Sequence, residues 1–214
     1  MVISLRVAFS RLSFVNMELA PGLVVRVPRL IVYAIDNHSD HDEGKTSTGK
    51  LVDKAKPYSD FEGGNRNAAE ELGRQLAAIT DSFRREIRSR SMKELRMVEA
   101  VCAVPFFGDR ELSLPHVLAT HVAEALQVED LSSQVRKTRD TNPRRSARGF
   151  EVDETRFAAG QAVQGRRIAL VDDVVRSGGT LASLARALLR DGAHLAEVGL
   201  CATKARALRG IDEH

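Results

Sequence analysis

The sequence predicts an α/β fold in which helices flank a parallel, Rossmann-like sheet, and three observations support this prediction. First, the segments Val98–Val104 and Arg167–Val171 are almost continuously apolar, as is typical of strands that are covered on both faces. Second, each segment precedes a stretch whose apolar residues recur with helical spacing. Third, the connections are short, which is the βαβ pattern of a parallel sheet with right-handed crossovers.

The amino-terminal half adds strands and one long helix. Leu23–Ile35 is rich in Val, Leu and Ile and is interrupted by Pro28, which indicates one or two strands, the first of them at a sheet edge. Residues 37–59 have the composition of an exposed loop with at most one short strand. A helix then begins at an Asn65 or Asn67 cap. Its apolar face consists of Leu72, Leu76, Ile79, Phe83 and Ile87.

Further elements are expected in the carboxyl-terminal half. A helix starts near Pro115, because proline is favoured at the first helical position. Gly149–Val152 is a candidate for a short strand, and Thr180–Arg190 for an amphipathic helix that ends at Gly192. His194–Cys201 is expected to form the last strand. The apolar faces of the two helices are Leu118, Val122, Ala125 and Leu126, and Leu181, Leu184, Ala185 and Leu188.

Length and composition favour one enzyme-sized domain with an appendage. We divide the 214 residues into an amino-terminal, partly irregular segment (1–60) and a core domain (61–214). The net charge of +3 is too small to indicate nucleic-acid binding by itself. No apolar run reaches the roughly 18 residues of a membrane span, so no membrane is expected. Cys102 and Cys201 lie in apolar segments rather than in a disulfide framework, which favours a reducing cytoplasm.

The segment with most chemical information joins the strand at Arg167–Val171 to the following helix. It reads Ile168-Ala-Leu-Val-Asp-Asp-Val-Val-Arg-Ser-Gly-Gly-Thr-Leu181. Ligands of open parallel sheets bind beyond the carboxyl ends of the strands, where Asp172 and Asp173 stand. Two adjacent acids there repel each other and lose hydration unless they meet hydroxyl groups or a cation. A sugar diol satisfies them.

A run of small residues follows the acids and precedes the helix. Ser177, Gly178, Gly179 and Thr180 let the backbone approach a ligand closely. The free N–H groups at the helix start favour an anion there. A phosphate group therefore fits this position. The alternative is that the acids cap the helix and the glycines only form a turn.

A diol site next to a phosphate site describes a ribose 5-phosphate. From Leu170 to Leu181 the chain resembles the motif by which type I phosphoribosyltransferases bind 5-phosphoribosyl-1-pyrophosphate (PRPP). The resemblance implies a type I phosphoribosyltransferase-like sheet with a small hood from the terminal segments. It also implies that Asp172 and Asp173 are catalytic. The implied PRPP-binding residues are Val174, Val175, Arg176, Ser177, Gly178, Gly179, Thr180 and Leu181.

Among these families, the chain most resembles the ComF-type phosphoribosyltransferases, which are associated with competence, from about Val101 to Lys204. Pro105, Phe106 and Arg110 take the position of the family's pyrophosphate-binding loop. ComF-like proteins have an Arg-rich stretch with an Arg-Gly-Phe-Asn-Gln run there, whereas this chain has Phe-Phe-Gly-Asp-Arg-Glu. The family's zinc ribbon has no counterpart, because the sequence lacks Cys-x-x-Cys, and no structural zinc is expected.

A basic stretch occupies the position of the mobile loop that closes over PRPP in this superfamily. From Arg136 to Arg148 there are six basic residues and one acid. Arg136, Lys137 and Arg139 at its start would stabilise the leaving pyrophosphate and exclude water. A solvated loop is an equally favoured interpretation. Contact with nucleic acid is less favoured, because no aromatic residue is interleaved for base stacking.

The resemblance implies an enzyme of the glycosyltransferase class. It would transfer the 5-phosphoribosyl group of PRPP to a nitrogenous acceptor of nucleotide metabolism and release pyrophosphate. Mg²⁺ would be carried by the oxygens of PRPP, with no metal ligands from the protein. A homodimer is an open alternative, because dimers are common in the superfamily. The rival hypotheses are a non-catalytic PRPP sensor and a nucleic-acid-associated accessory protein.

Several histidines need a separate interpretation. The patch of His38, Asp40, His41, Asp42 and Glu43 has metal-ligand residue types without a recognisable spacing, so an exposed acidic loop is the favoured interpretation. The single residues His116, His121 and His194 are interpreted as surface residues rather than as catalysts.

Overall fold

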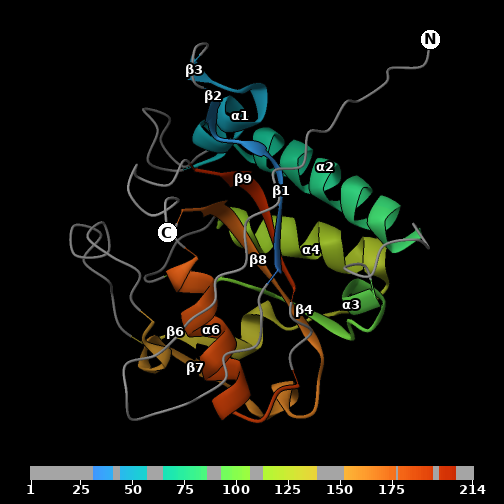
Figure 1. The fold of residues 1–214 in the computed structure, drawn as a ribbon, viewed down its shortest axis with the longest axis vertical. Coiled ribbons are helices and arrows are strands. Elements are labelled where there is room, and N and C mark those ends of the chain that lie inside the picture. Colours follow the sequence, from blue (N-terminus) through green and yellow to red (C-terminus); the bar gives the residue numbers. More distant parts are fainter. Residues whose placement is uncertain are drawn as a thin grey trace, which may run out of the picture.

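The computed structural model describes residues 31–40, 44–56, 65–85, 93–106, 113–138, 152–176, 178–194 and 198–205. At their centre is a five-stranded sheet in the order β1-β9-β8-β4-β5, whose neighbouring strands are all parallel (Figure 1). The prediction of a parallel sheet flanked by helices is confirmed. The strands are β1 (Ile31–Asn37), β4 (Ala100–Ala103), β5 (Glu129–Asp130), β8 (Ile168–Val175) and β9 (Val198–Lys204).

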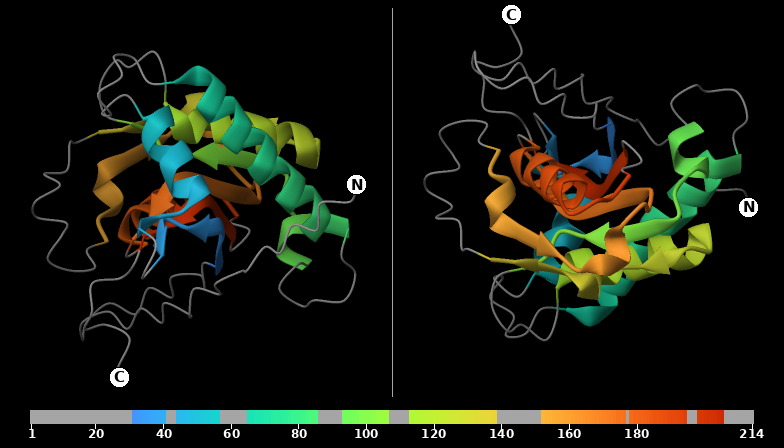
Figure 2. Two further views of the ribbon diagram at one scale, coloured as in Figure 1. Left: turned by 90° about the horizontal axis from the view of Figure 1, so that it is seen from above. Right: turned by 90° about the horizontal axis from the view of Figure 1, so that it is seen from below.

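Both faces of the sheet are covered (Figure 2). One face carries α1 (Ser47–Ala55), α2 (Arg66–Arg85) and α4 (Leu114–Leu126). The other carries α6 (Gly179–Arg190) and an antiparallel ribbon of β6 (Val135–Lys137) and β7 (Phe157–Ala159). The other described elements are α3 (Lys93–Arg96), β2 (Ser39–Asp40), β3 (Gly44–Lys45) and 3₁₀ turns at Ser132–Gln134, Glu154–Arg156 and Gln161–Val163.

Strand β8 shows why the apolar runs in the sequence are continuous. Successive side chains of a strand point to opposite faces of the sheet. Ala169 and Val171 enter the core formed with α2 and α4, whereas Ile168 and Leu170 enter the core formed with α6. Because both faces are buried, every position of the strand is apolar until Asp172.

Most predicted elements are present near their expected bounds. The side chain of Asn65 accepts a hydrogen bond from Ala68 N–H at 3.0 Å, which identifies Asn65 rather than Asn67 as the cap of α2. Pro115 lies in the first turn of α4. Gly192 follows α6 with a φ of 95°, as expected for a helix stop. Residues 23–30 of the first predicted strands and Ile87 of the predicted long helix lie outside the described residues.

The two cysteines lie in buried strands, as predicted, and both are free thiols. Burial raises the pKa of the Cys102 thiol to about 12 and that of Cys201 further. Both side chains therefore act as small hydrophobic groups of the core.

The prediction of an exposed loop at residues 37–59 is wrong. This stretch contains β2, β3 and the nine-residue helix α1. The sequence of α1, Ser-Thr-Gly-Lys-Leu-Val-Asp-Lys-Ala, has too few apolar residues for a clear periodicity. A helix this short is marginal alone, and α1 is stabilised by burying Val52 and Ala55 against the sheet.

The prediction of an irregular loop beginning at Arg136 also needs correction. Arg136 and Lys137 belong to β6, which pairs with β7 in the register Arg136 to Ala158 and Lys137 to Phe157. Val135 and Phe157 anchor this ribbon in the α6 core. The ribbon was not apparent in the sequence because its two strands have three residues each. Most of the strand predicted at Gly149–Val152 lies outside the described residues.

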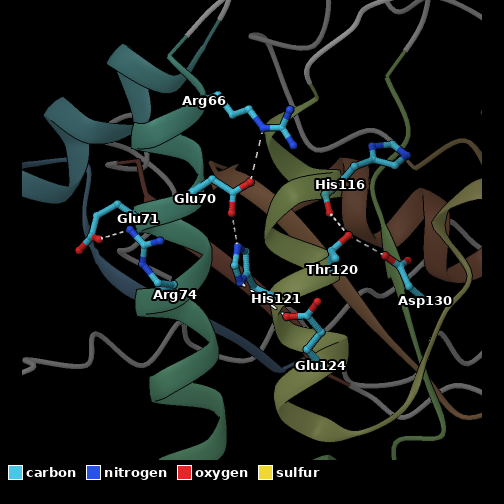
Figure 3. Close-up of polar contacts among 9 residues, drawn as sticks. All are labelled: Arg66, Glu70, Glu71, Arg74, His116, Thr120, His121, Glu124 and Asp130. Atoms are coloured by element: carbon cyan, nitrogen blue, oxygen red, sulfur yellow. Dashed lines mark hydrogen bonds and ion pairs between the residues drawn. The ribbon is translucent and has the colours of Figure 1, made fainter.

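Helices α2 and α4 pack closely through a polar contact (Figure 3). Glu70 of α2 and His121 of α4 point toward each other, with 2.6 Å between Glu70 Oε2 and His121 Nε2. Gly73 lies next to the imidazole ring, and a Cβ at this position would come within 2.2 Å of His121 Cδ2. The missing side chain of Gly73 therefore makes room for His121, which is half-buried and not, as expected from the sequence, a surface residue.

The substitution Gly73→Ala is expected to lower the free energy of unfolding. Alanine gains about 1 kcal/mol of helix propensity over glycine, but overpacking a close contact costs about 1 to 3 kcal/mol. Urea denaturation of wild type and variant measures the difference. In a His121→Ala background the same substitution should be neutral or stabilising. Equal destabilisation in both backgrounds would show that the His121 ring is not the cause.

Candidate functional site

The direction of the chain through the sheet changes between β4 and β8. From β4 the chain passes through α4 to β5, and from β8 it passes through α6 to β9 on the opposite side. Because β4 and β8 are neighbours, their carboxyl ends flank this switch point. Ligands of open parallel sheets bind at such points. The segments that follow β4 and β8 therefore form the candidate site.

The acid pair lies on the part of β8 that extends beyond β4. Val171 is in register with Ala103 at the end of β4. From Asp172 onward β8 continues alongside β9, as far as the pairing of Val175 with Lys204. The predicted strand end at Val171 is thus corrected to Val175. Both acids belong to a paired strand, which fixes their backbone more firmly than a loop would.

Hydrogen bonds fix the orientation of both carboxylates. Asp172 Oδ1 accepts from the backbone N–H of Asp173 at 2.9 Å. Asp173 Oδ1 accepts from the N–H of Val174 at 2.6 Å. The other oxygen, Asp173 Oδ2, lies 2.9 Å from Lys56 Nζ, the ammonium group at the end of α1.

The two acids differ in their electrostatic surroundings. Burial, and after it the charge of Asp173, raise the pKa of Asp172 well above its ordinary value. The N–H of Asp173 and the charge of Lys56 act in the opposite direction. Lys56 thus lies beside Asp173 and opposes the rise in the pKa of Asp172. Perturbed carboxylates of this kind are typical of functional sites.

The predicted PRPP-binding residues divide into core and surface positions. The side chains of Val175 and Leu181 are buried in the α6 core, so only their backbone groups can reach a ligand. Val174 packs against the opposite core. Arg176 and Thr180 are exposed at the carboxyl end of β8 and the start of α6. Ser177 lies outside the described residues.

The two glycines of this segment have different roles. Gly178 is the N-cap of α6 and has a φ of 78°, in the left-handed region that favours glycine. Gly179 is buried in the first turn of α6, where Ser183 Oγ donates to its carbonyl group at 2.7 Å. The twelve-residue helix α6 thus begins directly beside the acid pair, with its N-terminus at the candidate site.

Elements β2, β3 and α1, which we call the hood, lie at the carboxyl ends of β1 and β9 (Figure 1). The backbone N–H of His38, just after β1, donates to the carbonyl of Lys204 at the end of β9, 2.8 Å away. Gly49 of α1 touches His38 so closely that a Cβ would stand 2.1 Å from its carbonyl oxygen. Thr46 Oγ1 caps α1 by accepting from Gly49 N–H at 3.0 Å. These contacts fix α1 against the end of the sheet.

The interpretation of His38 as part of an exposed acidic loop is wrong. Its side chain is 19% exposed, with Nε2 3.5 Å from Asp53 Oδ1 and Nδ1 3.3 Å from Thr203 Oγ1. Burial lowers the pKa of His38, an effect that Asp53 opposes. Lys45 forms a second ion pair with Asp53. The other members of the patch are not described beyond the backbone of Asp40, and no three His, Cys, Asp or Glu side chains in the described segments are placed to hold a metal ion.

The predicted pyrophosphate and mobile-loop residues are only partly described. Pro105 is buried and Phe106 is 38% exposed, both directly after β4 at the switch point. Arg110 and Arg139 lie outside the described residues. Arg136 and Lys137 lie in β6 on the α6 face of the sheet.

Among the described contacts, none places His116 or His194 in an arrangement typical of a catalytic residue. His116 Nδ1 lies 2.9 Å from Ser113 Oγ at the start of α4. Burial lowers its pKa, and Asp130 partly offsets this effect. His116 is thus half-buried rather than a surface residue, whereas His194 is exposed as predicted.

Lys56 is the part of the site that the sequence did not reveal. It lies in a stretch with loop composition, far along the chain from Asp173, and no motif includes it. Its distance from Asp173 depends on how α1 packs against β1 and β9. Local sequence patterns contain no information about that packing.

The sequence matches no protein-family model and no curated protein. The fold is similar to the structure of the allosteric regulatory enzyme of purine biosynthesis, with 20% identity, a TM-score of 0.41, and coverage of 72% of this chain and 29% of that chain. For glutamine phosphoribosylpyrophosphate (PRPP) amidotransferase from B. subtilis the identity is 20%, the TM-score 0.40 and the coverages 69% and 30%. For adenine phosphoribosyltransferase from Leishmania tarentolae the identity is 13% and the TM-score 0.40, with coverage of 75% of this chain and 88% of that chain.

This chain thus spans less than a third of the length of the first two proteins. No helix in the described segments has the length and apolar character that a membrane crossing requires.

The substitution Asp172→Asn is expected to stabilise the protein at neutral pH. Because folding raises the pKa of Asp172, its contribution to stability is fully present below the ordinary value of 3.8 and is lost as pH rises through the folded-state pKa. Each unit of pKa shift corresponds to about 1.4 kcal/mol. Denaturation at several pH values should show a gain that grows above pH 3.8. A variant that is less stable than wild type at neutral pH would contradict the assigned pKa direction.

Proposed function

We propose that this protein binds PRPP and transfers its 5-phosphoribosyl group to a nitrogenous acceptor. The observation that carries this proposal is the continuous segment β8–α6 at the switch point of the sheet. It presents two carboxyl groups in different electrostatic surroundings, Asp172 and Asp173, directly before the glycine-containing N-terminus of α6. Carboxylate groups suit a ribose diol, and the N-terminus of a helix suits a 5-phosphate.

The acid pair suits the diol and the charge of the reacting sugar. Asp173 can accept a hydrogen bond from one ribose hydroxyl group, while a protonated Asp172 can both donate to and accept from the other. As the bond from the anomeric carbon to pyrophosphate breaks, positive charge develops on the sugar. A negative charge fixed nearby stabilises that state. The acceptor nitrogen then forms the new bond and loses a proton.

The start of α6 suits the 5-phosphate. The helix dipole and the backbone N–H groups at a helix N-terminus attract an anion. The left-handed φ of Gly178 turns the chain into the helix. Apart from its chain neighbours, no atom of the described residues lies within 4 Å of the position that a Cβ would take there. A phosphate can therefore approach the backbone closely. Arg176, exposed just before this turn, adds positive charge.

Mg²⁺ enters the proposal as a companion of PRPP. One carboxylate of the pair, Asp173, is already occupied by Val174 N–H and by Lys56. This arrangement fits a metal that is held by pyrophosphate and ribose oxygens rather than by the protein. When bound, the ion would neutralise charge on the leaving pyrophosphate. The chain's own residues would orient the sugar and the 5-phosphate.

The ComF-type subclass and a cytoplasmic, nucleotide-metabolic role are part of the same proposal. They are supported by the resemblance from about Val101 to Lys204. The hood at residues 39–55 lies where the superfamily's acceptor-binding hood is expected, next to the acid pair. Its residues would select the acceptor.

A non-catalytic PRPP sensor is the second candidate. It is favoured by the segment after Phe106, which lacks the Arg-rich run of ComF-like proteins. Both candidates bind PRPP, but only the enzyme releases pyrophosphate when acceptor bases are added. A pyrophosphate-release assay over a panel of nitrogenous bases therefore separates them.

The proposal is tested by calorimetric titration of PRPP with Mg²⁺. Wild type should bind, and an Asp172→Asn, Asp173→Asn double variant should lose about tenfold to a hundredfold in affinity, because the hydrogen bond of a ribose hydroxyl group to the Asp173 carboxylate is lost. Asp81→Asn, near the far end of α2, is the matched control and should bind like wild type. A folded wild-type protein that does not bind PRPP would overturn the proposal.

A further inference from the structure

One ion pair joins the hood to the acid pair. Lys56 Nζ lies 2.9 Å from Asp173 Oδ2, although the two residues belong to different layers of the molecule. The Lys56 side chain is 26% exposed and that of Asp173 18%. An ion pair shielded to this degree is screened less by salt than a surface pair.

The position of Lys56 is fixed by the backbone of the hood. Lys56 is the C-cap of α1, and its N–H donates to the carbonyl groups of Val52 and Asp53. The contact of Gly49 with the carbonyl of His38 fixes the other end of the helix. The ammonium group thus reaches Asp173 from a rigid support rather than from a free loop.

The titratable groups near the acid pair and His38 come from three parts of the chain. Lys56 approaches from α1, and its charge acts on both Asp172 and His38. Cys201 of β9 lies beside the pair, and both acids raise the pKa of its thiol. Arg176 follows β8, close enough for its charge to act on His38. Of these groups, Lys56 has an ion pair with the acids.

We propose that Lys56 is a positioning residue of the acid pair: its ammonium group holds the Asp173 carboxylate in one orientation, so that the position of the hood and the binding of the ribose diol are coupled. This inference rests on the proposed PRPP site. The charge of Lys56 also lowers the pKa of Asp172, so Lys56 acts on both members of the pair. Displacing α1 would remove the Lys56 ammonium group from Asp173 Oδ2. The pair would then take up a proton more easily and accept hydrogen bonds from ribose hydroxyl groups less well.

The variant Lys56→Gln tests this role. Its affinity for PRPP should fall about tenfold, the usual effect of losing one charged interaction in a partly buried site. The loss should be largest at low pH, because the charge of Lys56, which lowers the pKa of Asp172, is absent from this variant and the acid pair takes up protons more easily. Lys56→Arg should restore much of the affinity. Lys54→Gln, an exposed lysine in the same turn of α1, is the matched control and should leave binding unchanged.

A second readout needs no PRPP. The aspartate carboxyl signals of ¹³C-labelled, ligand-free protein are followed by NMR as a function of pH. In Lys56→Gln the titration of the acid pair should move to higher pH, whereas Lys56→Arg and Lys54→Gln should titrate like wild type. If Lys56→Gln does not fold, the test is made with Lys56→Arg, which keeps the positive charge. If the acid pair of Lys56→Arg titrates differently from that of wild type, the proposed role of the charge is overturned.

The outcomes separate this inference from the proposed function. If wild type does not bind PRPP, the proposed function fails, and the carboxyl titration alone decides whether Lys56 controls the pair. If Lys56→Gln titrates and binds like wild type, the inference is overturned. Weaker binding by the same factor at every pH, with an unchanged titration, also overturns it and assigns Lys56 a purely structural contact.

Discussion

Partial burial of two adjacent carboxyl groups at the end of a central strand is the constraint on which the rest of the site depends. Asp172 loses its hydration and lies next to a second acid, so its charged form is disfavoured. Such a pair is stable only if one member is neutral or if cations and N–H donors surround it. The structure uses both solutions: Asp172 has a raised pKa, and Asp173 is held by Val174 N–H and Lys56.

This constraint explains the shape of the surrounding fold. β8 extends beyond β4 and stays paired with β9, so the acids are held by strand geometry at an open edge. The next helix starts immediately after, with a left-handed Gly178 making the turn. The electrostatic cost is thus concentrated where the sheet changes direction, which is the place where ligand binding can offset it.

The hood links the amino-terminal part of the chain to this site. Its helix α1 is too short and too polar to be stable alone, and its position depends on the contact of Gly49 with His38 and on buried Val52 and Ala55. On the far side of this layer, the close packing of α2 on α4 through Gly73 and His121 supports the same face of the sheet. The charge at the acid pair therefore depends on packing across several elements.

The sequence by itself determined the class of the fold, the central strands and the position of the acid pair. Continuous apolar runs, helical periodicity, the Asn65 cap and the Gly192 stop are local signals, and burial on both faces of the sheet makes them strong. Lys56, the partly buried His38 and the β6–β7 ribbon were decided only by the tertiary structure. Short elements carry little periodicity, and an ion pair between residues far apart in the chain leaves no local pattern. The perturbed pKa of Asp172 likewise arises from burial and from charges brought together in space, because the dipeptide Asp-Asp alone would be hydrated in an unfolded chain.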